Sequence, residues 1–283
     1  MKIIECPRDA MQGLDTFIPT EQKIAYINAL LEVGFDSIDF GSFVSAKAIP
    51  QMRDTKEVLA GINWKTSKSA LLAIVANTRG AEEASAFEGI TYLGFPLSIS
   101  ETFQQRNTNK SIAEALSTLE EIQNVCQRSG KQLVTYISMG FGNPYGDPYE
   151  VKLVANFVDI IATIGCRVVS LADTIGVSNP ENITYLFSNL SKQFPEIELG
   201  AHLHSNPATS IEKIDAAYLA GCRRFDGAIR GFGGCPMAKD ELVGNMATET
   251  ILGYLREKNV STSINDKAFA RALAMADKTF PGH

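Results

Sequence analysis

Two histidines, at positions 202 and 204, are the strongest chemical signal in the sequence. They lie in Ala201-His-Leu-His204, at the end of a predicted strand, and the chain has only three histidines in all. Side chains at positions i and i+2 of a strand project from one face, so both imidazoles should point at one spot, as ligands of a divalent metal do. Two hydrogen-bonded histidines at a strand end are the alternative interpretation.

Charged residues mark the ends of three other predicted strands. Arg8 and Asp9 follow the first strand, Asp39 lies near the end of the second, and Asp173 follows the sixth. A carboxylate is a hard oxygen ligand for a metal, and an arginine can stabilise a developing oxyanion. The alternatives are an ordinary ion pair between Arg8 and Asp9 and a turn cap at Asp173.

A glycine-rich loop, Gly231-Phe-Gly-Gly-Cys-Pro236, follows the last predicted strand. Its glycines allow movement, and Cys235 is its one reactive group, although a phosphate-cradling loop with an incidental thiol is the alternative. Asn245, further along, offers a neutral oxygen, while a helix cap is its commonest role. The remaining cysteines are interpreted as core packing residues: Cys6, Cys126, Cys166 and Cys222.

The composition restricts the class of protein and its partners. Of the 283 residues, 45% are hydrophobic and 20% are charged, which is typical of a globular chain with a large core. A net charge of −6 argues against nucleic acid or an anionic membrane as the main partner. No apolar run approaches the roughly 18 residues that span a bilayer, and the N-terminus enters a predicted strand at once. An odd number of cysteines without a CxxC pair fits a reducing compartment, so we expect a cytoplasmic protein.

Short apolar strands alternate with amphipathic helices along the whole chain, the pattern of a parallel sheet covered by helices. No linker divides residues 1–283, so we predict a single (β/α)8 TIM-barrel domain, with an extra C-terminal helix between Asn265 and His283. An open doubly wound sheet is the alternative. In such a barrel the active site lies at the C-terminal ends of the strands, where the residues above are found. The predicted strands are Ile3–Cys6, Ser37–Phe40, Ala70–Ala76, Thr91–Phe95, Leu133–Ser138, Arg167–Leu171, Glu198–His204 and Arg224–Ala228.

Capping signals mark the helices between these strands. The spacing of Ser111 and Glu114, and of Thr209 and Glu212, predicts two capping boxes. Asp147 and Asn179 each precede a proline, which predicts two further helix starts. Glycines that end helices shortly before a strand support a repeated unit: Gly34, Gly89, Gly130, Gly165 and Gly221.

Together these motifs resemble the hydroxymethylglutaryl-CoA lyases, within the barrel metalloenzymes that make or break carbon–carbon bonds by aldol and Claisen chemistry. The Arg-Asp and His-x-His elements belong to the whole group. The Ser-Phe-Val-Ser…Pro-Gln-Met run and the Gly-Gly-Cys-Pro loop point to the lyase branch. The resemblance covers nearly the whole chain and is carried by Glu5–Gln12, Ser42–Met52, Ser170–Gly176, His202–His204 and Gly231–Pro236.

The resemblance implies a role for each of these motifs. Arg8 would stabilise an enolate, and Asp173 or His202 would help to remove a hydroxyl proton. Cys235 would transfer a proton at the acetyl carbon, and Asp39 stands where the family has a glutamate. The implied ligands of Mg²⁺ or Mn²⁺ are Asp9, His202, His204 and Asn245. The implied substrate contacts are Gln12, Ser42, Ser170 and Thr174.

The implied reaction cleaves 3-hydroxy-3-methylglutaryl-CoA to acetyl-CoA and acetoacetate, with an acyl-CoA as the partner of a homodimer. Three segments depart from the family. Residues 13–16 lack a lysine expected to meet CoA phosphate, residues 205–208 replace an Asp-Thr-Tyr-Gly-like segment, and residues 237–243 form a longer loop. A related aldolase or Claisen-type synthase acting on another hydroxy acid, keto acid or acyl-CoA is therefore an alternative. A non-catalytic binding barrel is a second alternative, although it needs no such convergence of acid, base and ligand residues.

Overall fold

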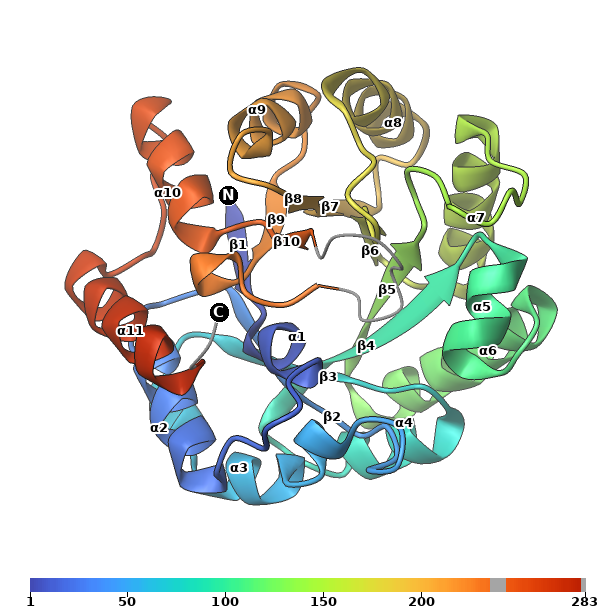
Figure 1. Ribbon diagram of the computed structural model, residues 1–283. Coiled ribbons are helices and arrows are strands. Elements are labelled where there is room, and N and C mark those ends of the chain that lie inside the picture. The colour runs from blue at the N-terminus through green and yellow to red at the C-terminus, as the bar shows by residue number, and fades with distance from the viewer. Residues whose placement is uncertain (235–242, 281–283) are drawn as a thin grey trace.

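Eight parallel strands form a closed barrel at the centre of the computed structural model, which describes residues 1–234 and 243–280. Each strand pairs with the next along the chain, and β9 pairs with β1, which closes the cylinder (Figure 1). The predicted (β/α)8 barrel is confirmed and the open sheet is excluded. The barrel strands are β1 (Lys2–Glu5), β2 (Ser37–Ser42), β3 (Ala70–Ile74), β4 (Ile90–Ser98), β5 (Gln132–Ser138), β6 (Val168–Ala172), β7 (Glu198–His202) and β9 (Arg224–Gly227).

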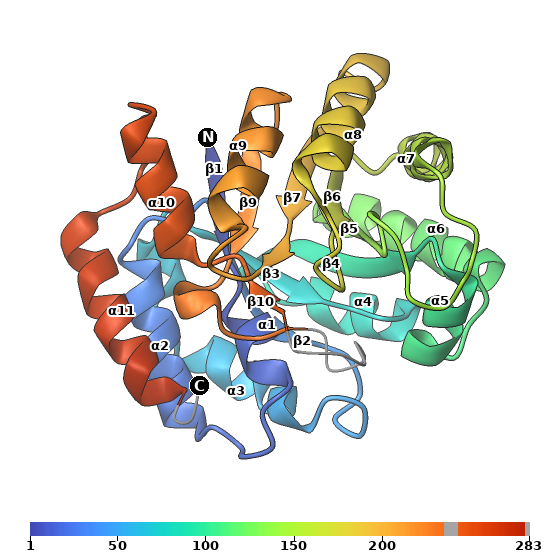
Figure 2. The same cartoon turned by 45° about the horizontal axis from the view of Figure 1, so that its top comes forward.

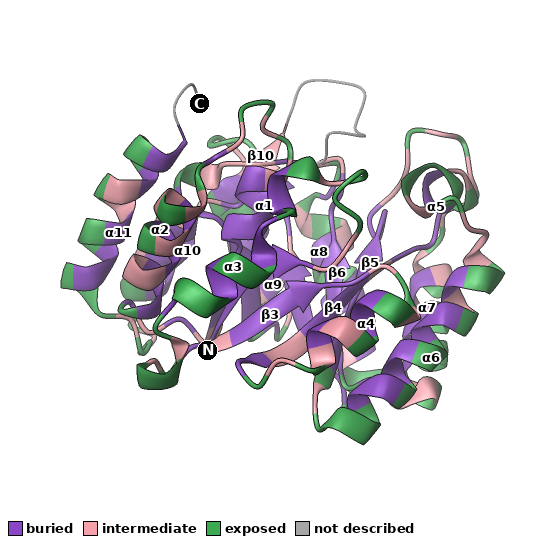
Figure 3. Cartoon of the chain, turned by 90° about the horizontal axis from the view of Figure 1, so that it is seen from below, coloured by how far each residue is buried: buried purple, intermediate pink, exposed green. Residues whose placement is uncertain are grey.

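Helices surround the barrel on its outside. Figures 1 and 2 show α2 to α11 as an outer ring, whereas the short α1 lies within that ring, directly after β1. The inner faces of the helices are apolar and buried, and their outer faces are polar and exposed (Figure 3). The helices are α1 (Pro7–Gln12), α2 (Thr20–Leu31), α3 (Thr55–Gly61), α4 (Thr78–Ser85), α5 (Glu101–Thr108), α6 (Ile112–Ser129), α7 (Val151–Ile164), α8 (Pro180–Gln193), α9 (Ser210–Leu219), α10 (Thr248–Glu257) and α11 (Asp266–Thr279).

Local capping explains where several helices begin and end. Ser111 and Glu114 form the predicted capping box of α6, and Asn179 caps α8 in the same reciprocal way with Asn182. Gly130 ends α6 with a φ of 69°, in the left-handed region that glycine adopts without strain. Gly34, Gly165 and Gly221 also have positive φ values, as the prediction of helix-ending glycines requires.

Three local predictions were wrong. Helix α7 begins at Val151, and Asp147 instead accepts hydrogen bonds from Ser100 Oγ and the Thr102 N–H at the start of α5. Thr209 makes no side-chain cap on α9, because its hydroxyl contacts Asn206. Gly89 does not have a positive φ; it is a glycine because a side chain there would meet the ring of Trp64.

The predicted C-terminal helix is present as α11. The Asn265 side chain caps it by accepting from the N–H groups of Lys267 and Ala268. The helix packs against α2, and the ring of Phe280, just beyond its end, meets Tyr26 edge-on at a centroid distance of 5.5 Å. Among the helices that the structure describes, none is both long and apolar enough to cross a membrane.

The seventh predicted strand divides into two elements. Strand β7 ends at His202, and His204 starts a separate short strand, β8 (His204–Ser205). This strand pairs antiparallel with β10 (Gly244–Asn245), so that His204 lies opposite Asn245. The two histidines therefore lie on consecutive strands rather than on the one predicted strand, although their side chains converge as predicted. The β8/β10 pair nevertheless brings the second histidine back beside the first.

Glu5 helps to hold the closing strands together from a fully buried position at the end of β1. Its carboxylate accepts from the Ile229 N–H at 2.9 Å and from Thr248 Oγ1 at 2.6 Å, which ties β1 to the segments after β9. Burial raises the pKa of Glu5 from 4.5 to about 8, because a buried carboxylate loses its hydration.

We predict that Glu5→Gln makes the protein more stable than the wild type above pH 8. A folded-state pKa above the unfolded value means that the contribution of Glu5 is complete below about pH 4.5 and is lost as the pH rises through about 8. An amide stays neutral, so the variant should not lose stability over this range. The measurement is urea unfolding at pH 5 and pH 9, with Glu257→Gln on the exposed face of α10 as the control. Equal pH slopes in the wild type and Glu5→Gln would contradict the prediction.

Candidate active site

Asp9, His202 and His204 come together at the C-terminal mouth of the barrel. Each offers one ligand atom, and these three atoms lie within 4.8 Å of one another, close enough to hold a metal ion. The two imidazole rings have a centroid distance of 5.5 Å. The three residues come from the helix after β1, from the end of β7 and from β8, so only the folded barrel brings them together.

His204 carries the clearest indication that the group suits a metal. Both of its ring nitrogens are buried, and neither has a hydrogen-bond partner among the described residues. Burial, reinforced by His202, lowers the pKa of His204 to about 4, so the ring is neutral at physiological pH. A neutral imidazole is the form that binds a metal, and a bound cation would satisfy a nitrogen that is otherwise costly to bury.

Asn245 and Gln12 hold the Asp9 carboxylate in place. Asn245 Nδ2 donates to Asp9 Oδ2 at 2.7 Å and to the Phe232 carbonyl at 2.9 Å, which leaves its own Oδ1 as the remaining ligand atom. Gln12 Nε2 donates to Asp9 Oδ1 at 2.7 Å. The Gln12 side chain thus contacts a ligand residue, and its predicted contact with substrate stays a prediction. The mixture of nitrogen and oxygen donors fits a divalent ion with room for further ligands.

Arg8 lies between two buried carboxylates. Its Nη2 is 2.5 Å and its Nε 3.0 Å from Asp39 Oδ2, and its Nη1 is 2.9 Å from Asp9 Oδ1. Although burial opposes charge, Arg8 and both histidines lower the pKa of Asp9 below its usual value. Burial has the opposite net effect on the second acid: it raises the pKa of Asp39 to about 6 in spite of Arg8. The guanidinium is therefore fixed, and the two acids differ in proton affinity.

Asp173 lies at the end of β6 but takes part in structural contacts. It accepts hydrogen bonds from the Ser178 N–H and hydroxyl and from Lys213 Nζ at 3.1 Å. The same ammonium donates to the His204 carbonyl at 2.9 Å. Asp173 therefore caps the turn that follows β6, as the alternative interpretation expected. Lys213 connects this turn to β8.

Three predicted substrate residues occupy different parts of the barrel mouth. Thr174 Oγ1 accepts from the N–H of Met139, whose φ of 57° lies in the left-handed region. Ser170 lies deeper, with its hydroxyl 3.2 Å from Asp226 Oδ2. Ser42 ends β2 and its hydroxyl accepts from the Val44 N–H. Their predicted contacts with substrate stay predictions.

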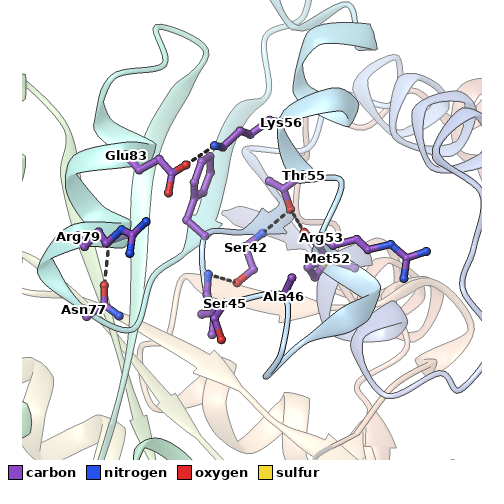
Figure 4. A pocket seen from close by; sticks show the side chains of 13 residues that line it. Ser42, Ser45, Ala46, Met52, Arg53, Thr55, Lys56, Asn77, Arg79 and Glu83 are labelled. Atoms are coloured by element: carbon purple, nitrogen blue, oxygen red, sulfur yellow. Dashed lines mark hydrogen bonds and ion pairs between the residues drawn. The ribbon is translucent and has the colours of Figure 1, made fainter.

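A cavity of about 300 Å³ adjoins Ser42 between the loops that follow β2 and β3. Figure 4 shows Lys56 and Glu83 pointing toward each other as an ion pair, with Arg79 nearby. Arg53 lines the same cavity. The Arg53 guanidinium itself lies over the ring of Phe17, 3.6 Å from its centroid, and points away from the ion pair (Figure 4). Lys56 and Arg79 beside one acid leave a surplus of positive charge, which suits an anionic group.

Comparison with known proteins decides the family. Residues 2–275 match the family described as HMGL-like. The chain belongs to the HMGL-like family.

Several similar proteins are named as lyases. Hydroxymethylglutaryl-CoA lyase YngG of Bacillus subtilis is 34% identical over 96% of this chain and 90% of its own length. The 3-hydroxy-3-isohexenylglutaryl-CoA/hydroxy-methylglutaryl-CoA lyase of Pseudomonas aeruginosa is 32% identical over 94% of this chain and 88% of its own length. An HMG-CoA lyase structure from Acinetobacter baumannii, in complex with coenzyme A and 3-methylmalate, superposes with a TM-score of 0.91. It is 31% identical and covers 99% of this chain and 90% of its own.

The glycine-rich segment before Cys235 lies against the candidate site. Cys235 itself lies outside the described residues, so its predicted role stays a prediction. Gly233 has a φ of 91°, and a Cβ there would lie 2.8 Å from Asn245 Nδ2 and from the Asp9 carbonyl. Only glycine allows the backbone to approach the ligand residues this closely.

Sequence reasoning missed two charged residues of the site. Asp226 lies 3.2 Å from His202 Nδ1, and its signal was an acid in the middle of an otherwise buried strand. Lys213 gave no comparable signal, because a lysine on an amphipathic helix ordinarily faces solvent. Its burial follows from the packing of α9 over the loop that contains Asp173.

We predict that His204→Ala abolishes stoichiometric uptake of Mn²⁺, because one of three converging ligands is lost. Isothermal titration calorimetry of the metal-free protein measures this directly. His283→Ala, which removes the third histidine of the sequence, is the matched control and should bind like the wild type. An unchanged affinity in His204→Ala would remove the site from consideration.

Proposed function

We propose that this protein cleaves 3-hydroxy-3-methylglutaryl-CoA to acetyl-CoA and acetoacetate in a reaction that depends on a divalent metal. The observation that carries the proposal is the convergence of Asp9, His202 and His204 beside a fixed Arg8 at the barrel mouth. Similar proteins named hydroxymethylglutaryl-CoA lyase support this substrate. A binding barrel would have no need to bury a neutral, unpartnered histidine beside such an ion pair.

The metal proposed for the site is Mg²⁺ or Mn²⁺. Asp9, His202, His204 and Asn245 would hold it, a donor set that suits an octahedral ion. When bound, such an ion acts as a Lewis acid that lowers the pKa of a coordinated hydroxyl.

Bond cleavage also requires a base, an electrophile and an acid from the chain itself. The substrate hydroxyl gives up its proton and becomes the ketone of acetoacetate, while the C2–C3 electron pair moves to C2 as a thioester enolate. Arg8 is held by Asp39 and Asp9 before substrate arrives, so its charge can stabilise the enolate oxygen without reorganisation. Cys235, by the family resemblance, would then protonate C2 to give acetyl-CoA.

Asp39 and Asp173 differ in their freedom to accept the hydroxyl proton. Asp173 already accepts hydrogen bonds from Ser178 and Lys213, which hold it as part of the loop. Asp39 binds Arg8 through Oδ2, and its Oδ1 is buried without a partner among the described residues. A pKa of about 6 places Asp39 near the value that suits a general base at neutral pH. We therefore assign the base to Asp39 and a positioning role to Asp173.

The cavity beside Ser42 is the proposed site for part of the CoA moiety. Its basic residues Lys56 and Arg79 would face phosphate groups, in place of the lysine that residues 13–16 lack. The related structure with coenzyme A supports an acyl-CoA ligand. The single catalytic domain of residues 1–283, the homodimer and the cytoplasmic location stay predictions from the sequence.

We predict that the Mn²⁺-loaded protein forms acetoacetate from 3-hydroxy-3-methylglutaryl-CoA, and that Cys235→Ser lowers kcat by about 10²- to 10⁴-fold. This is the usual loss when a positioned acid is removed. Coupled detection of acetoacetate and acetyl-CoA measures both, and Cys222→Ser, at a buried cysteine of the core, is the matched control. No acetoacetate from folded, metal-loaded wild type would overturn the proposed function and favour the related aldolase or synthase. A fully active Cys235→Ser would show that its thiol is incidental.

We predict that Asp39→Asn and Asp173→Asn fail in different ways. If Asp39 is the base, kcat/KM of the wild type falls as the pH drops through about 6, and this limb should disappear in Asp39→Asn with a loss of about 10²-fold or more. Asp173→Asn leaves Lys213 buried without a carboxylate, which should lower the free energy of unfolding by about 3–5 kcal/mol. Activity profiles from pH 5 to 8 and urea unfolding separate the two. An acid limb that persists in Asp39→Asn would assign the base elsewhere.

A further inference from the structure

A carboxylate that the proposed reaction does not use lies behind His202. Asp226 is buried on β9, and the register of the parallel strands pairs it directly with His202 on β7. Asp226 Oδ2 is 3.2 Å from His202 Nδ1. The second contact of this oxygen is the Ser170 hydroxyl, also at 3.2 Å.

This contact determines which nitrogen of His202 carries the proton. A carboxylate can only accept a hydrogen bond, so the nitrogen that faces it, Nδ1, must be the donor in the neutral ring. The other nitrogen, Nε2, then keeps its lone pair and is the one available to the group formed with Asp9 and His204. An imidazole protonated at Nε2 could not act as a ligand there.

An arginine keeps a positive charge on the other side of Asp226. Arg224 is 2% exposed, and its Nε lies 3.8 Å from Asp226 Oδ1. Its Nη1 lies 3.4 Å from Glu198 Oε1, and Glu198 in turn pairs with Lys2 at 2.6 Å. Charges of alternating sign therefore run from the partly exposed pair of Lys2 and Glu198 to the buried Arg224 and Asp226 beside His202.

The barrel makes room for this arginine by omitting a side chain. A Cβ at Gly200 would lie 2.9 Å from Arg224 Cδ and 3.1 Å from Ser170 Oγ, so any larger residue would displace the arginine. Gly200 and Arg224 are paired across β7 and β9, two residues before the pair of His202 and Asp226. The strand register thus places the Arg224 guanidinium beside the Asp226 carboxylate, and the Asp226 carboxylate beside the His202 imidazole.

We propose that Asp226, supported by Arg224, is the positioning residue that holds His202 in the tautomer protonated at Nδ1, with Nε2 directed at the cation site. The inference rests on the proposed function only for the use of that site. The tautomer itself is a property of the metal-free protein.

The test is ¹⁵N NMR of the histidine-labelled, metal-free protein, in which three histidines give a simple spectrum. His204→Ala and His283→Ala assign the His202 signals. In the wild type, Nδ1 of His202 should have the shift of a protonated nitrogen and Nε2 that of an unprotonated one. Asp226→Ala removes the acceptor and should raise the fraction protonated at Nε2. Mn²⁺ affinity, measured by calorimetry, should fall by about 10- to 100-fold, as when an outer-shell partner of a ligand histidine is lost.

Further variants keep the result interpretable. Asp215→Ala removes an acid of α9 that contacts Tyr254 and Lys258, and it should leave the His202 shifts and the Mn²⁺ affinity unchanged. If Asp226→Ala does not fold, Asp226→Asn gives the same readout, because an amide is not restricted to accepting. Arg224→Gln should shift the tautomer in the same direction by a smaller amount.

A folded Asp226 variant with the wild-type tautomer and Mn²⁺ affinity would overturn the proposal, and an unchanged Arg224→Gln would remove the arginine from it. Neither measurement uses substrate. A shifted tautomer in a protein that forms no acetoacetate would therefore leave the positioning role intact and reject only the proposed reaction.

Discussion

The buried charge of Arg8 is the constraint on which the site depends. A guanidinium away from water is stable only with carboxylates around it, and here Asp39 and Asp9 supply them from β2 and α1. The arrangement fixes the arginine at the mouth and orients Asp9 toward the histidines. One ion-pair network thus positions both the proposed electrophile and one proposed metal ligand, and loss of either acid would leave Arg8 with a single carboxylate partner.

The second constraint is the short β8/β10 pair above the barrel. It pairs His204 with Asn245, two residues that the parallel strands alone would not bring together. Lys213 supports the pair from below by donating to the His204 carbonyl and to Asp173. Gly233 lets the backbone after β9 lie directly against Asn245 and the Asp9 carbonyl. The ligand group is therefore built from a barrel strand and from backbone that leaves the barrel.

One segment that departs from the lyase family, residues 205–208, lies beside this framework. Residues 205–208 connect β8 to α9, and within them Asn206 accepts hydrogen bonds from the following turn through its side chain. Lys213, in the first turn of α9, is buried at a position where an apolar residue would be expected. The mouth beside β8 thus has its own polar contacts, while Asp9, His202 and His204 lie close enough together to hold a metal ion.

The sequence by itself determined the alternation of hydrophobic strands and capped amphipathic helices, which predicts a barrel, and the pairing of β9 with β1 then excluded the open sheet. It also indicated the residues that meet at the candidate metal site, since polar side chains after buried strands have no packing reason to be there. Only the tertiary structure decided the partners: His204 left the strand of His202, Asp173 met Lys213, and Asp226 came to face His202. Strand register, barrel closure and the burial of charge set these contacts. They depend on residues far apart in the chain, which no local pattern of residue types records.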